Sequence, residues 1–339
     1  MINPVYSPAS DRYNNGIRYR RCGNSGILLP EIALGLWHNF GDVNPLANSF
    51  QMAHYAFDHG IVHFDLANNY GPSYGSAEET FGQIMRKSFA PFRDELFISS
   101  KAGYDMWPGP YGEWGSRKYL IASLNQSLKR MNLDYVDLFY SHRYDPSTPL
   151  EETMQALVDI VRMGKALYVG ISNYPAQAAG FAYRYLRERD VPCLLYQGRY
   201  NILNREPEQE ILDQAQANGT GFIAFSPLAQ GLLTNRYLNG IPADSRMAQE
   251  RFLKSSALTP ALHAALLKLN EMAAGRGQSL AQMALAWCLK DQKVCSVIIG
   301  ASRTEQIADN LKALENTSFS PEELEAIAQC AANNHICRS

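Results

Sequence analysis

The chain of 339 residues has no marked excess of charge, few cysteines and no long apolar run, and each shortage excludes a class of protein. With 31 Lys and Arg against 33 Asp and Glu, the formal net charge is −2, and nothing indicates nucleic-acid binding. No apolar run approaches the roughly 18 residues that span a bilayer. The polar opening, MINPVYSPASDRYNNG, lacks the apolar region of a secretory signal. We therefore expect neither a membrane nor a nucleic acid as partner.

The cysteines are scattered along the chain and none forms a Cys-x-x-Cys pair. They are Cys22, Cys193, Cys288, Cys295, Cys330 and Cys337. Such spacing is typical of reduced thiols in a cytoplasmic protein. No HExxH motif or clustered Cys/His spacing predicts a metal site.

The sequence does contain strand-like apolar runs that alternate with helix-like stretches, at intervals of about 30 to 45 residues. The runs cover residues 31–37, 61–67, 95–101, 135–142, 166–173, 193–197, 221–228 and 294–300. They are nearly continuous in apolar residues, as expected for parallel strands buried on both faces. Eight such units predict an α/β protein with a (β/α)8 TIM barrel.

A doubly wound open sheet is the competing arrangement. Its G-x-G-x-x-G fingerprint is not found, since GRG at residues 275–277 lacks the third glycine and follows a helix-like stretch. No linker divides the chain, so we expect a single domain over residues 1–339 with a barrel core at about 17–320. A polar N-terminal tail (1–16), a long loop after the seventh strand, and a C-terminal helix and tail (320–339) complete it.

Polar side chains stand where several of these runs end, the place where barrel enzymes hold catalytic residues. Asp65 lies inside an apolar run and needs a cationic partner, which Lys101 on the next run can provide. An ammonium beside the Tyr70 phenol would lower its pKa from about 10. His142 could orient a substrate oxygen or relay the proton. Taken singly, such a lysine is usually a solvated charge and such a histidine usually structural, so the prediction depends on the combination.

Together these four residues could protonate a carbonyl oxygen as it gains negative charge. They supply an acid and electrostatic support but no electrons, so a cofactor must bring the hydride.

Asp65, Tyr70, Lys101 and His142 lie in FDLANNYG, SSKAGY and FYSHRYD, where they resemble the catalytic tetrad of the aldo-keto reductase family. Further segments follow in the family's order over about residues 17–320: GLW from 35, GISNY from 170, YQGRYN from 196, FSPLAQGLL from 225 and IIGASRTEQIADN from 298. Longer stretches such as GLWHNFGDVN are most similar to a group of bacterial L-glyceraldehyde 3-phosphate reductases, which are related to potassium channel β subunits.

The resemblance implies an NADP(H)-dependent reductase of small aldehydes, such as L-glyceraldehyde 3-phosphate or methylglyoxal. Tyr70 would be the general acid, Lys101 and Asp65 would tune it, and His142 would place the carbonyl. The residues implied for cofactor binding are Trp37, Asp65, Ser172, Asn173, Gln197, Phe225, Ser226, Leu228, Gln230, Gly231, Arg236, Arg246, Gly300, Ser302, Gln306, Asp309 and Asn310.

Within that set, Ser172 and Gln197 would hold the nicotinamide carboxamide. Phe225 would stack on the ring, where many relatives carry tyrosine or tryptophan. Backbone N–H groups at the start of the last barrel helix suit a phosphate. Arg303 offers a fork for a 2′-phosphate, and with Arg236 and Arg246 it favours NADPH over NADH.

The candidate substrate residues are Trp37, Trp107, Tyr111 and Arg143. The three aromatic residues could wall a small hydrophobic mouth, although the WPGP segment from Trp107 is equally well interpreted as a rigid turn. Arg143 either meets an anionic group such as a substrate phosphate or pairs with Asp145.

Two other functions stay open at this stage. One is a cofactor-occupied binding subunit or redox sensor like the channel β subunits, although those relatives carry asparagine at the position of His142. The other is an unrelated phosphate-binding barrel lyase or isomerase, which would use a lysine or glutamate base and no nicotinamide. The resemblance also implies a homo-oligomer, either a tetramer or an octamer.

Overall fold

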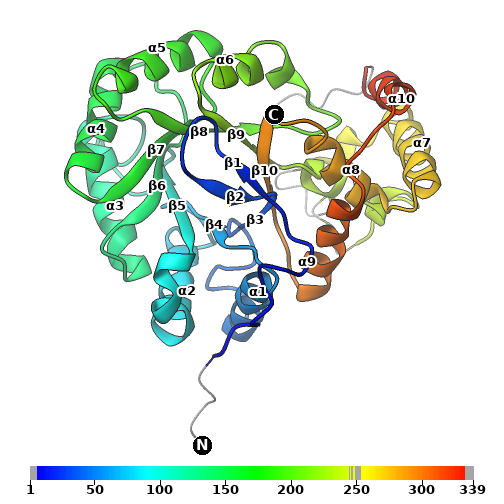
Figure 1. Ribbon diagram of the computed structural model, residues 1–339, viewed down its shortest axis with the longest axis horizontal. Coiled ribbons are helices and arrows are strands. Elements are labelled where there is room, and N and C mark those ends of the chain that lie inside the picture. Colours follow the sequence, from blue (N-terminus) through cyan, green and yellow to red (C-terminus); the bar gives the residue numbers. More distant parts are fainter. Residues whose placement is uncertain (1–5, 244, 246, 249–252, 333–339) are drawn as a thin grey trace, which may run out of the picture.

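A computed structural model describes residues 6–243, 245, 247–248 and 253–332. Its centre is a closed parallel barrel with the strand order β10-β3-β4-β5-β6-β7-β8-β9 (Figure 1). The strands are β3 (Ile32–Gly35), β4 (His63–Asp65), β5 (Phe97–Ala102), β6 (Val136–Ser141), β7 (Ala166–Ser172), β8 (Cys193–Arg199), β9 (Gly221–Phe225) and β10 (Val294–Ile299). Each predicted apolar run overlaps one of them, with β5 and β8 extending one and two residues beyond their runs. The predicted (β/α)8 barrel is confirmed, and the open sheet is wrong.

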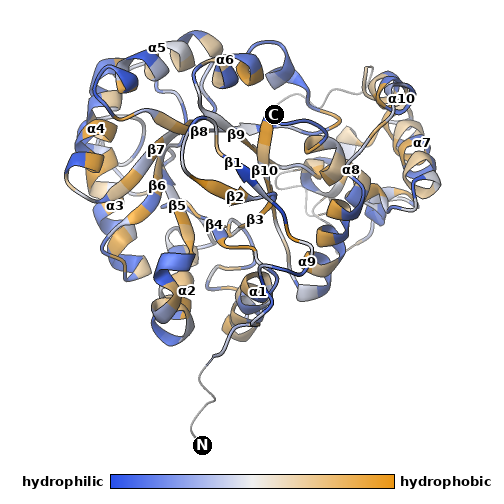
Figure 2. Cartoon of the chain, viewed as in Figure 1, coloured by the Kyte–Doolittle hydropathy of each residue, from blue (hydrophilic) through white to orange (hydrophobic). Residues whose placement is uncertain are grey.

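Helices surround the barrel (Figure 1). They are α1 (Leu46–Asp58), α2 (Ser76–Ile84), α3 (Arg117–Met131), α4 (Leu150–Arg162), α5 (Ala176–Arg187), α6 (Ile211–Ala217), α8 (Leu280–Cys288) and α9 (Thr304–Leu311). Most of them have one buried face, while α8 is buried along its whole length. On α3, leucines at a spacing of four residues face inward, with Leu120 and Leu124 fully buried and Leu128 8% exposed. Figure 2 shows the same division, with hydrophobic strands inside and hydrophilic stretches on the outer helices.

A short antiparallel hairpin, β1 (Tyr19–Arg21) and β2 (Leu28–Pro30), precedes the barrel and was not predicted. In Figure 1 it crosses the middle of the barrel. The backbone N–H of Asn24 donates to the carbonyl of Gly219, just before β9, so the hairpin lies at the amino ends of the strands. It packs Cys22 and Leu29 against the barrel interior. This leaves the carboxyl ends of the strands as the open end.

The chain on either side of the barrel also packs against it. Within the predicted N-terminal tail, the Tyr6 hydroxyl donates to Asp58 at the end of α1, and its ring stacks on His54 with centroids 3.8 Å apart. The expected long loop after the seventh barrel strand runs from 226 to 259, before α7 (Pro260–Gly275). The expected C-terminal helix is α10 (Pro321–Ala331), which the 2.7 Å ion pair of Arg276 and Glu323 holds beside α7.

Among the described residues, no helix is long and apolar enough to cross a bilayer. In the same part of the chain, no three His, Cys, Asp or Glu side chains come together as a metal site. Cys337 lies outside the described residues.

Candidate active site

The four predicted catalytic residues meet at the carboxyl ends of neighbouring strands. Asp65 ends β4, Lys101 lies near the end of β5, His142 follows β6, and Tyr70 lies in the loop between β4 and α2. The Nζ atom of Lys101 is 2.6 Å from Oδ2 of Asp65 and 3.2 Å from the Tyr70 hydroxyl oxygen. The rings of Tyr70 and His142 meet edge to face, with centroids 5.9 Å apart. The four residues predicted from the sequence are therefore close together in the structure.

The turn that presents Tyr70 requires the glycine that follows it. Gly71 has a φ of +84°, and a Cβ atom there would lie 2.4 Å from the Ser76 hydroxyl. Its backbone N–H donates to the carbonyl of Trp37, in the loop after β3. The phenol is thus held between two loops of the rim, because only glycine adopts this backbone without strain.

The Lys101 ammonium has three hydrogens, and the structure uses all of them. They go to the Asp65 carboxylate, to the carbonyl of Leu66 at 2.5 Å, and to the Tyr70 hydroxyl oxygen. The side chain is fully buried, so this saturation is what makes the burial of its charge tolerable. Because the phenol oxygen accepts from Lys101, its own hydrogen remains to be donated elsewhere.

Burial raises the pKa of the Tyr70 phenol well above its usual value, and the charge of Asp65 adds to the rise. The predicted lowering by Lys101 is therefore wrong for the protein without a bound ligand. The Asp65 carboxylate, 2.6 Å from the ammonium, offsets the field of Lys101 at the phenol. Tyr70 thus keeps its proton at neutral pH.

His142 is neutral at this site. Burial lowers its pKa well below the usual value, and the positive charges of Lys101 and Arg143 lower it further. A neutral imidazole carries one N–H donor and one acceptor. It can therefore donate a hydrogen bond to an oxygen next to Tyr70 without competing as the proton source.

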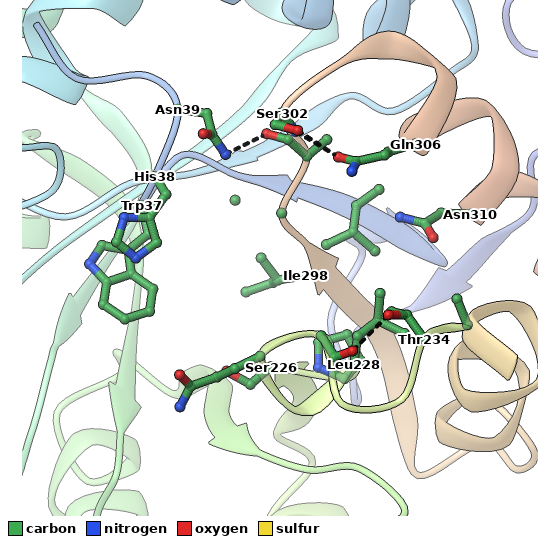
Figure 3. A pocket seen from close by; sticks show the side chains of 18 of the residues that line it. Trp37, His38, Asn39, Ser226, Leu228, Thr234, Ile298, Ser302, Gln306 and Asn310 are labelled. Carbon is green, nitrogen blue, oxygen red and sulfur yellow. Dashed lines mark hydrogen bonds between the residues drawn. The ribbon is translucent and has the colours of Figure 1, made fainter. Parts of the chain in front are cut away.

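A cavity of about 670 Å³ is lined by Tyr70 and extends to the start of α9. Figure 3 shows part of its lining, from Trp37 to Ser302 and Gln306. Most of the predicted cofactor residues line it: Trp37, Asp65, Gln197, Phe225, Ser226, Leu228, Gln230, Gly231, Arg236, Gly300, Ser302, Gln306, Asp309 and Asn310. Arg303 lines it as well. Ser172 and Asn173 do not. The amide of Asn173 donates to the Ser172 hydroxyl and to the carbonyl of His142. Arg246 lies outside the described residues.

Sequence reasoning missed several lining residues from the loop after β3, among them His38 and Asn39. The Asn39 amide donates to the carbonyl of Ala301 at 2.9 Å and so joins this loop to the one after β10 (Figure 3). Its φ of +69° lies in the left-handed region that asparagine tolerates. Nothing in the sequence distinguishes this asparagine from its neighbours, because the contact spans both ends of the chain.

The far end of the cavity is polar and is lined by charges of both signs, with Arg236 and Arg303 beside Glu305 and Asp309. The start of α9 holds Ser302, whose backbone N–H and hydroxyl both donate to the side-chain oxygen of Gln306. Arg303, at the N-cap position, is exposed, and Arg236 reaches the cavity from the long loop. A helix start with two arginines nearby is suited to an anion such as a phosphate.

Of the four candidate substrate residues, the structure places only Trp37 on this cavity. Trp107 packs on Tyr119 with ring centroids 5.1 Å apart, and Tyr111 is 56% exposed. Arg143 donates to Glu113 at 2.9 Å and to the carbonyl of Gly103 at 2.8 Å. The pairing of Arg143 with Asp145 is wrong.

The Asp145 carboxylate instead accepts hydrogen bonds from groups of the surrounding loops. Asp145 accepts from the backbone N–H groups of Ser147 and Gly115 and from the Thr148 hydroxyl. The residue next to Arg143 in space is therefore not the one near it in sequence.

Comparison with known proteins agrees with this geometry. The sequence profile of the Aldo/keto reductase family matches residues 31–332. L-glyceraldehyde 3-phosphate reductase of Escherichia coli K12 is 58% identical over 337 residues, covering 98% of this chain and 97% of that protein. A probable voltage-gated potassium channel subunit beta of Oryza sativa subsp. japonica is 37% identical over 307 residues, covering 88% and 92%. With the family profile on the barrel and the Tyr70–Lys101–Asp65 contacts at its open end, this chain belongs to the aldo/keto reductase family and is an oxidoreductase.

Proposed function

We propose that the protein is an NADP(H)-dependent reductase of small aldehydes with Tyr70 as the general acid. The proposal rests on the Lys101 ammonium. It donates its three hydrogens to the Asp65 carboxylate, the carbonyl of Leu66 and the Tyr70 hydroxyl oxygen. This arrangement leaves a protonated phenol with its hydrogen available next to a large cavity.

The cavity fits a dinucleotide by its size and by the order of its side chains. About 670 Å³ lies within the ~300–1,000 Å³ typical of small-molecule sites. Its inner end is flat and aromatic, with Phe225 and Trp37, and its outer end has the arginines near α9. The side-chain oxygen of Gln230 is buried without a hydrogen-bond partner among the described residues, as an acceptor kept for a ligand would be.

When bound, the reduced nicotinamide supplies a hydride to the carbonyl carbon. The residues of this chain then act on the carbonyl oxygen. His142 donates a hydrogen bond that positions the oxygen, and Tyr70 gives up its proton as negative charge develops there. The hydrogen bond from Lys101 to the phenol oxygen stabilises the phenolate that is left, and Asp65 keeps the ammonium in place.

The substrate class follows from the relatives and from the mouth of the site. The Escherichia coli relative is named for L-glyceraldehyde 3-phosphate, and we extend that substrate and methylglyoxal to this chain. Trp37, 39% exposed at the cavity mouth, offers an apolar wall 6.3 Å from the Tyr70 ring between centroids. Such a mouth suits a short aldehyde.

Consumption of NADPH in the presence of excess methylglyoxal or L-glyceraldehyde 3-phosphate tests the function. We expect turnover by the wild type and a loss of roughly 10²–10⁴-fold in kcat for Tyr70→Phe, because the proton donor is removed. NADPH affinity, followed by tryptophan fluorescence, should stay nearly unchanged. Equal turnover by the variant would refute the acid role.

The same assay separates this proposal from the two alternatives. A binding subunit or redox sensor predicts tight NADPH binding with single, slow turnovers, and a cofactor-free lyase or isomerase predicts no NADPH binding at all. Arg303→Ala tests the cofactor choice. It should raise KM for NADPH while leaving KM for NADH unchanged, because only NADPH carries the 2′-phosphate.

A further inference from the structure

A line of hydrogen bonds continues inward from the ion pair of Asp65 and Lys101. The Ser99 hydroxyl donates to Oδ1 of Asp65 at 2.8 Å, and Nε2 of His63 lies 3.0 Å from that hydroxyl. His63 and Ser99 are both 0% exposed. The parallel pairing of β4 with β5 sets Asp65 opposite Ser99, so the backbone itself fixes this contact.

The hydrogens along this line follow from the charge of Asp65. Its ion pair with Lys101 makes it a carboxylate, which can only accept. Ser99 has one hydroxyl hydrogen and gives it to that carboxylate, so His63 must donate from Nε2 to the hydroxyl oxygen. The other ring nitrogen, Nδ1, then carries no hydrogen. This agrees with its being buried without a hydrogen-bond partner among the described residues.

The line cannot deliver protons to the active site. It ends at the bare Nδ1 of His63, and the ring of Phe97 lies edge-on to that imidazole with centroids 5.0 Å apart. This end of the line is fully buried against an apolar ring, with no polar group of the described residues beyond it to pass a proton on. The line of hydrogen bonds can therefore only orient the side chains that it joins, Asp65, Ser99 and His63.

The carboxylate at the head of the line is held from several elements. Its Oδ1 accepts from Ser99 on β5 and from the Gln197 amide on β8 at 3.0 Å, which leaves Oδ2 for Lys101. The titratable groups whose charges act across this cluster include Asp65, Lys101, Tyr70, Tyr104 and His142, together with Tyr140 on β6, Cys22, Cys295, and Glu78 on α2. With Oδ1 occupied by two donors, the carboxylate has one orientation.

We propose that Ser99 and His63 are positioning residues of this site: His63 orients the Ser99 hydroxyl, and the hydroxyl fixes the Asp65 carboxylate so that its second oxygen faces Lys101. The inference rests on the proposed function, because its catalytic consequence passes through Lys101 to the phenol of Tyr70. Its geometric part, the tautomer of His63, can be measured without substrate.

The catalytic test compares Ser99→Ala with Ser99→Thr in the full-length protein. Ser99→Ala should lower kcat by roughly ten-fold through loss of a hydrogen bond to a charged group, with KM for aldehyde nearly unchanged. It should also shift the pH profile of kcat, since Lys101 is held less well against the phenol. Ser99→Thr keeps the hydroxyl and should restore both readouts.

The chain offers a matched control on the same strand. Ser100 is also fully buried, but its hydroxyl donates at 2.6 Å to Glu78 on α2, on the other side of β5. Ser100→Ala therefore removes a buried serine hydrogen bond without touching Asp65. We expect it to change stability but neither kcat nor the pH profile.

His63 is tested in two ways. His63→Leu, which cannot donate, should reduce kcat as Ser99→Ala does, and His63→Gln, which keeps an amide donor, should recover part of it. In the unliganded wild type, ¹⁵N NMR at neutral pH should show His63 protonated at Nε2 and bare at Nδ1.

The outcomes separate this inference from the proposed function. If wild-type protein does not oxidise NADPH with any aldehyde, the proposed function fails, and the NMR tautomer still decides the geometric claim. If wild type turns over while Ser99→Ala keeps its kcat and pH profile, or if Ser100→Ala has the same effect as Ser99→Ala, the positioning role is overturned. Protonation of His63 at Nδ1 overturns the assigned line of hydrogen bonds.

Discussion

Lys101 and Asp65 are two opposite charges taken almost completely out of water, with side chains 0% and 2% exposed. Neither charge is stable in the barrel without the other, because an uncompensated buried ion costs far more than the pair. Lys101→Met should therefore lower the free energy of unfolding by about 3–5 kcal/mol as well as stop turnover. Urea denaturation followed by circular dichroism measures the loss.

Two further variants make this prediction specific. Adding Asp65→Leu to Lys101→Met removes the orphaned carboxylate and should restore part of the stability, though not the activity. Lys129→Met, at an exposed position on α3, serves as the control and should change the free energy of unfolding little. An additive loss in the double variant would contradict the pairing argument.

The buried His63 gives stability a defined pH dependence. Burial lowers its pKa from about 6.5 to about 4. Between these values the unfolded chain binds a proton that the folded chain does not, so the free energy of unfolding falls as pH falls from 6.5 to 4. Each pH unit in that window costs about 1.4 kcal/mol, and about 3 kcal/mol is lost in all. Above about pH 6.5, His63 is neutral in both the folded and the unfolded chain, and its titration no longer changes the free energy of unfolding.

His63→Gln removes the titrating ring and should make the unfolding free energy depend less steeply on pH in that window. Denaturation curves of both proteins measured across the window give the difference directly, because the other titrating groups are common to both. Parallel curves for wild type and variant would show that His63 titrates normally in the folded protein.

At the level of single residues, the sequence was sufficient to predict that Asp65, Tyr70, Lys101 and His142 lie close together, and insufficient to predict the residues around them. Asp65 and Lys101 were found because a carboxylate within an apolar run demands a cation nearby. Ser99 and His63 gave no such signal, since serine and histidine are tolerated in buried strands when hydrogen-bonded. The pKa of Tyr70 was predicted in the wrong direction, because burial and the offset of the two charges cannot be judged before the fold is known.

At the scale of elements, the loop from β5 to α3 forms one side of the rim and is held together by Arg143. The guanidinium lies 3.6 Å from the ring centroid of Trp114 and 4.4 Å from that of Tyr104. Its N–H groups go to Glu113 and to the carbonyl of Gly103. Because two aromatic rings, a carboxylate and a backbone carbonyl of this loop all contact its guanidinium, Arg143 organises the loop beside His142.

This arrangement predicts how Arg143→Met will behave. A residue that binds a substrate phosphate would, on removal, raise KM for a phosphorylated aldehyde only. A residue that orders the loop should raise KM for phosphorylated and plain aldehydes alike and make residues 103–116 more sensitive to limited proteolysis. Steady-state kinetics with L-glyceraldehyde 3-phosphate and methylglyoxal distinguish the two, and a selective loss with the phosphorylated aldehyde contradicts the loop role.

The elements themselves were predictable to different degrees. The eight barrel strands were visible because strands covered on both faces are almost wholly apolar. The hairpin of β1 and β2 was missed because its strands have three residues each and YRR on β1 is polar. Loop conformation was beyond reach, since Arg143 finds Glu113 thirty positions away only once β5 and β6 are paired.

At the scale of the whole molecule, the two ends of the barrel have different tasks. The carboxyl ends of the strands carry the cavity and the tetrad, while the hairpin covers the amino ends. This division is typical of the fold, in which one end carries chemistry and the other stability. The expected cytoplasmic location and the expected homo-oligomer, a tetramer or an octamer, stay predictions. Light scattering on the purified protein can measure the number of subunits.

The division of labour can be tested at Arg20, on β1. Its guanidinium donates to the Glu31 carboxylate and to the backbone carbonyls of Leu289, Asp291 and Val294, and so ties the hairpin to the turn between α8 and β10. Removing Arg20 leaves the Glu31 carboxylate, which is 4% exposed, with the half-exposed Arg18 as its one remaining ion-pair partner among the described residues. Arg20→Met should therefore lower the free energy of unfolding by about 3–5 kcal/mol.

Because Arg20 lies at the end of the barrel opposite the tetrad, kcat per folded molecule should stay at the wild-type value. Arg21→Met is the matched control, since Arg21 is exposed on the same strand and donates only to the carbonyl of Ser25 among the described residues. Chemical denaturation and steady-state kinetics on the same samples provide both readouts. A fall in kcat without a fall in stability would mean that the hairpin communicates with the active site, and that the two ends of the barrel are not independent.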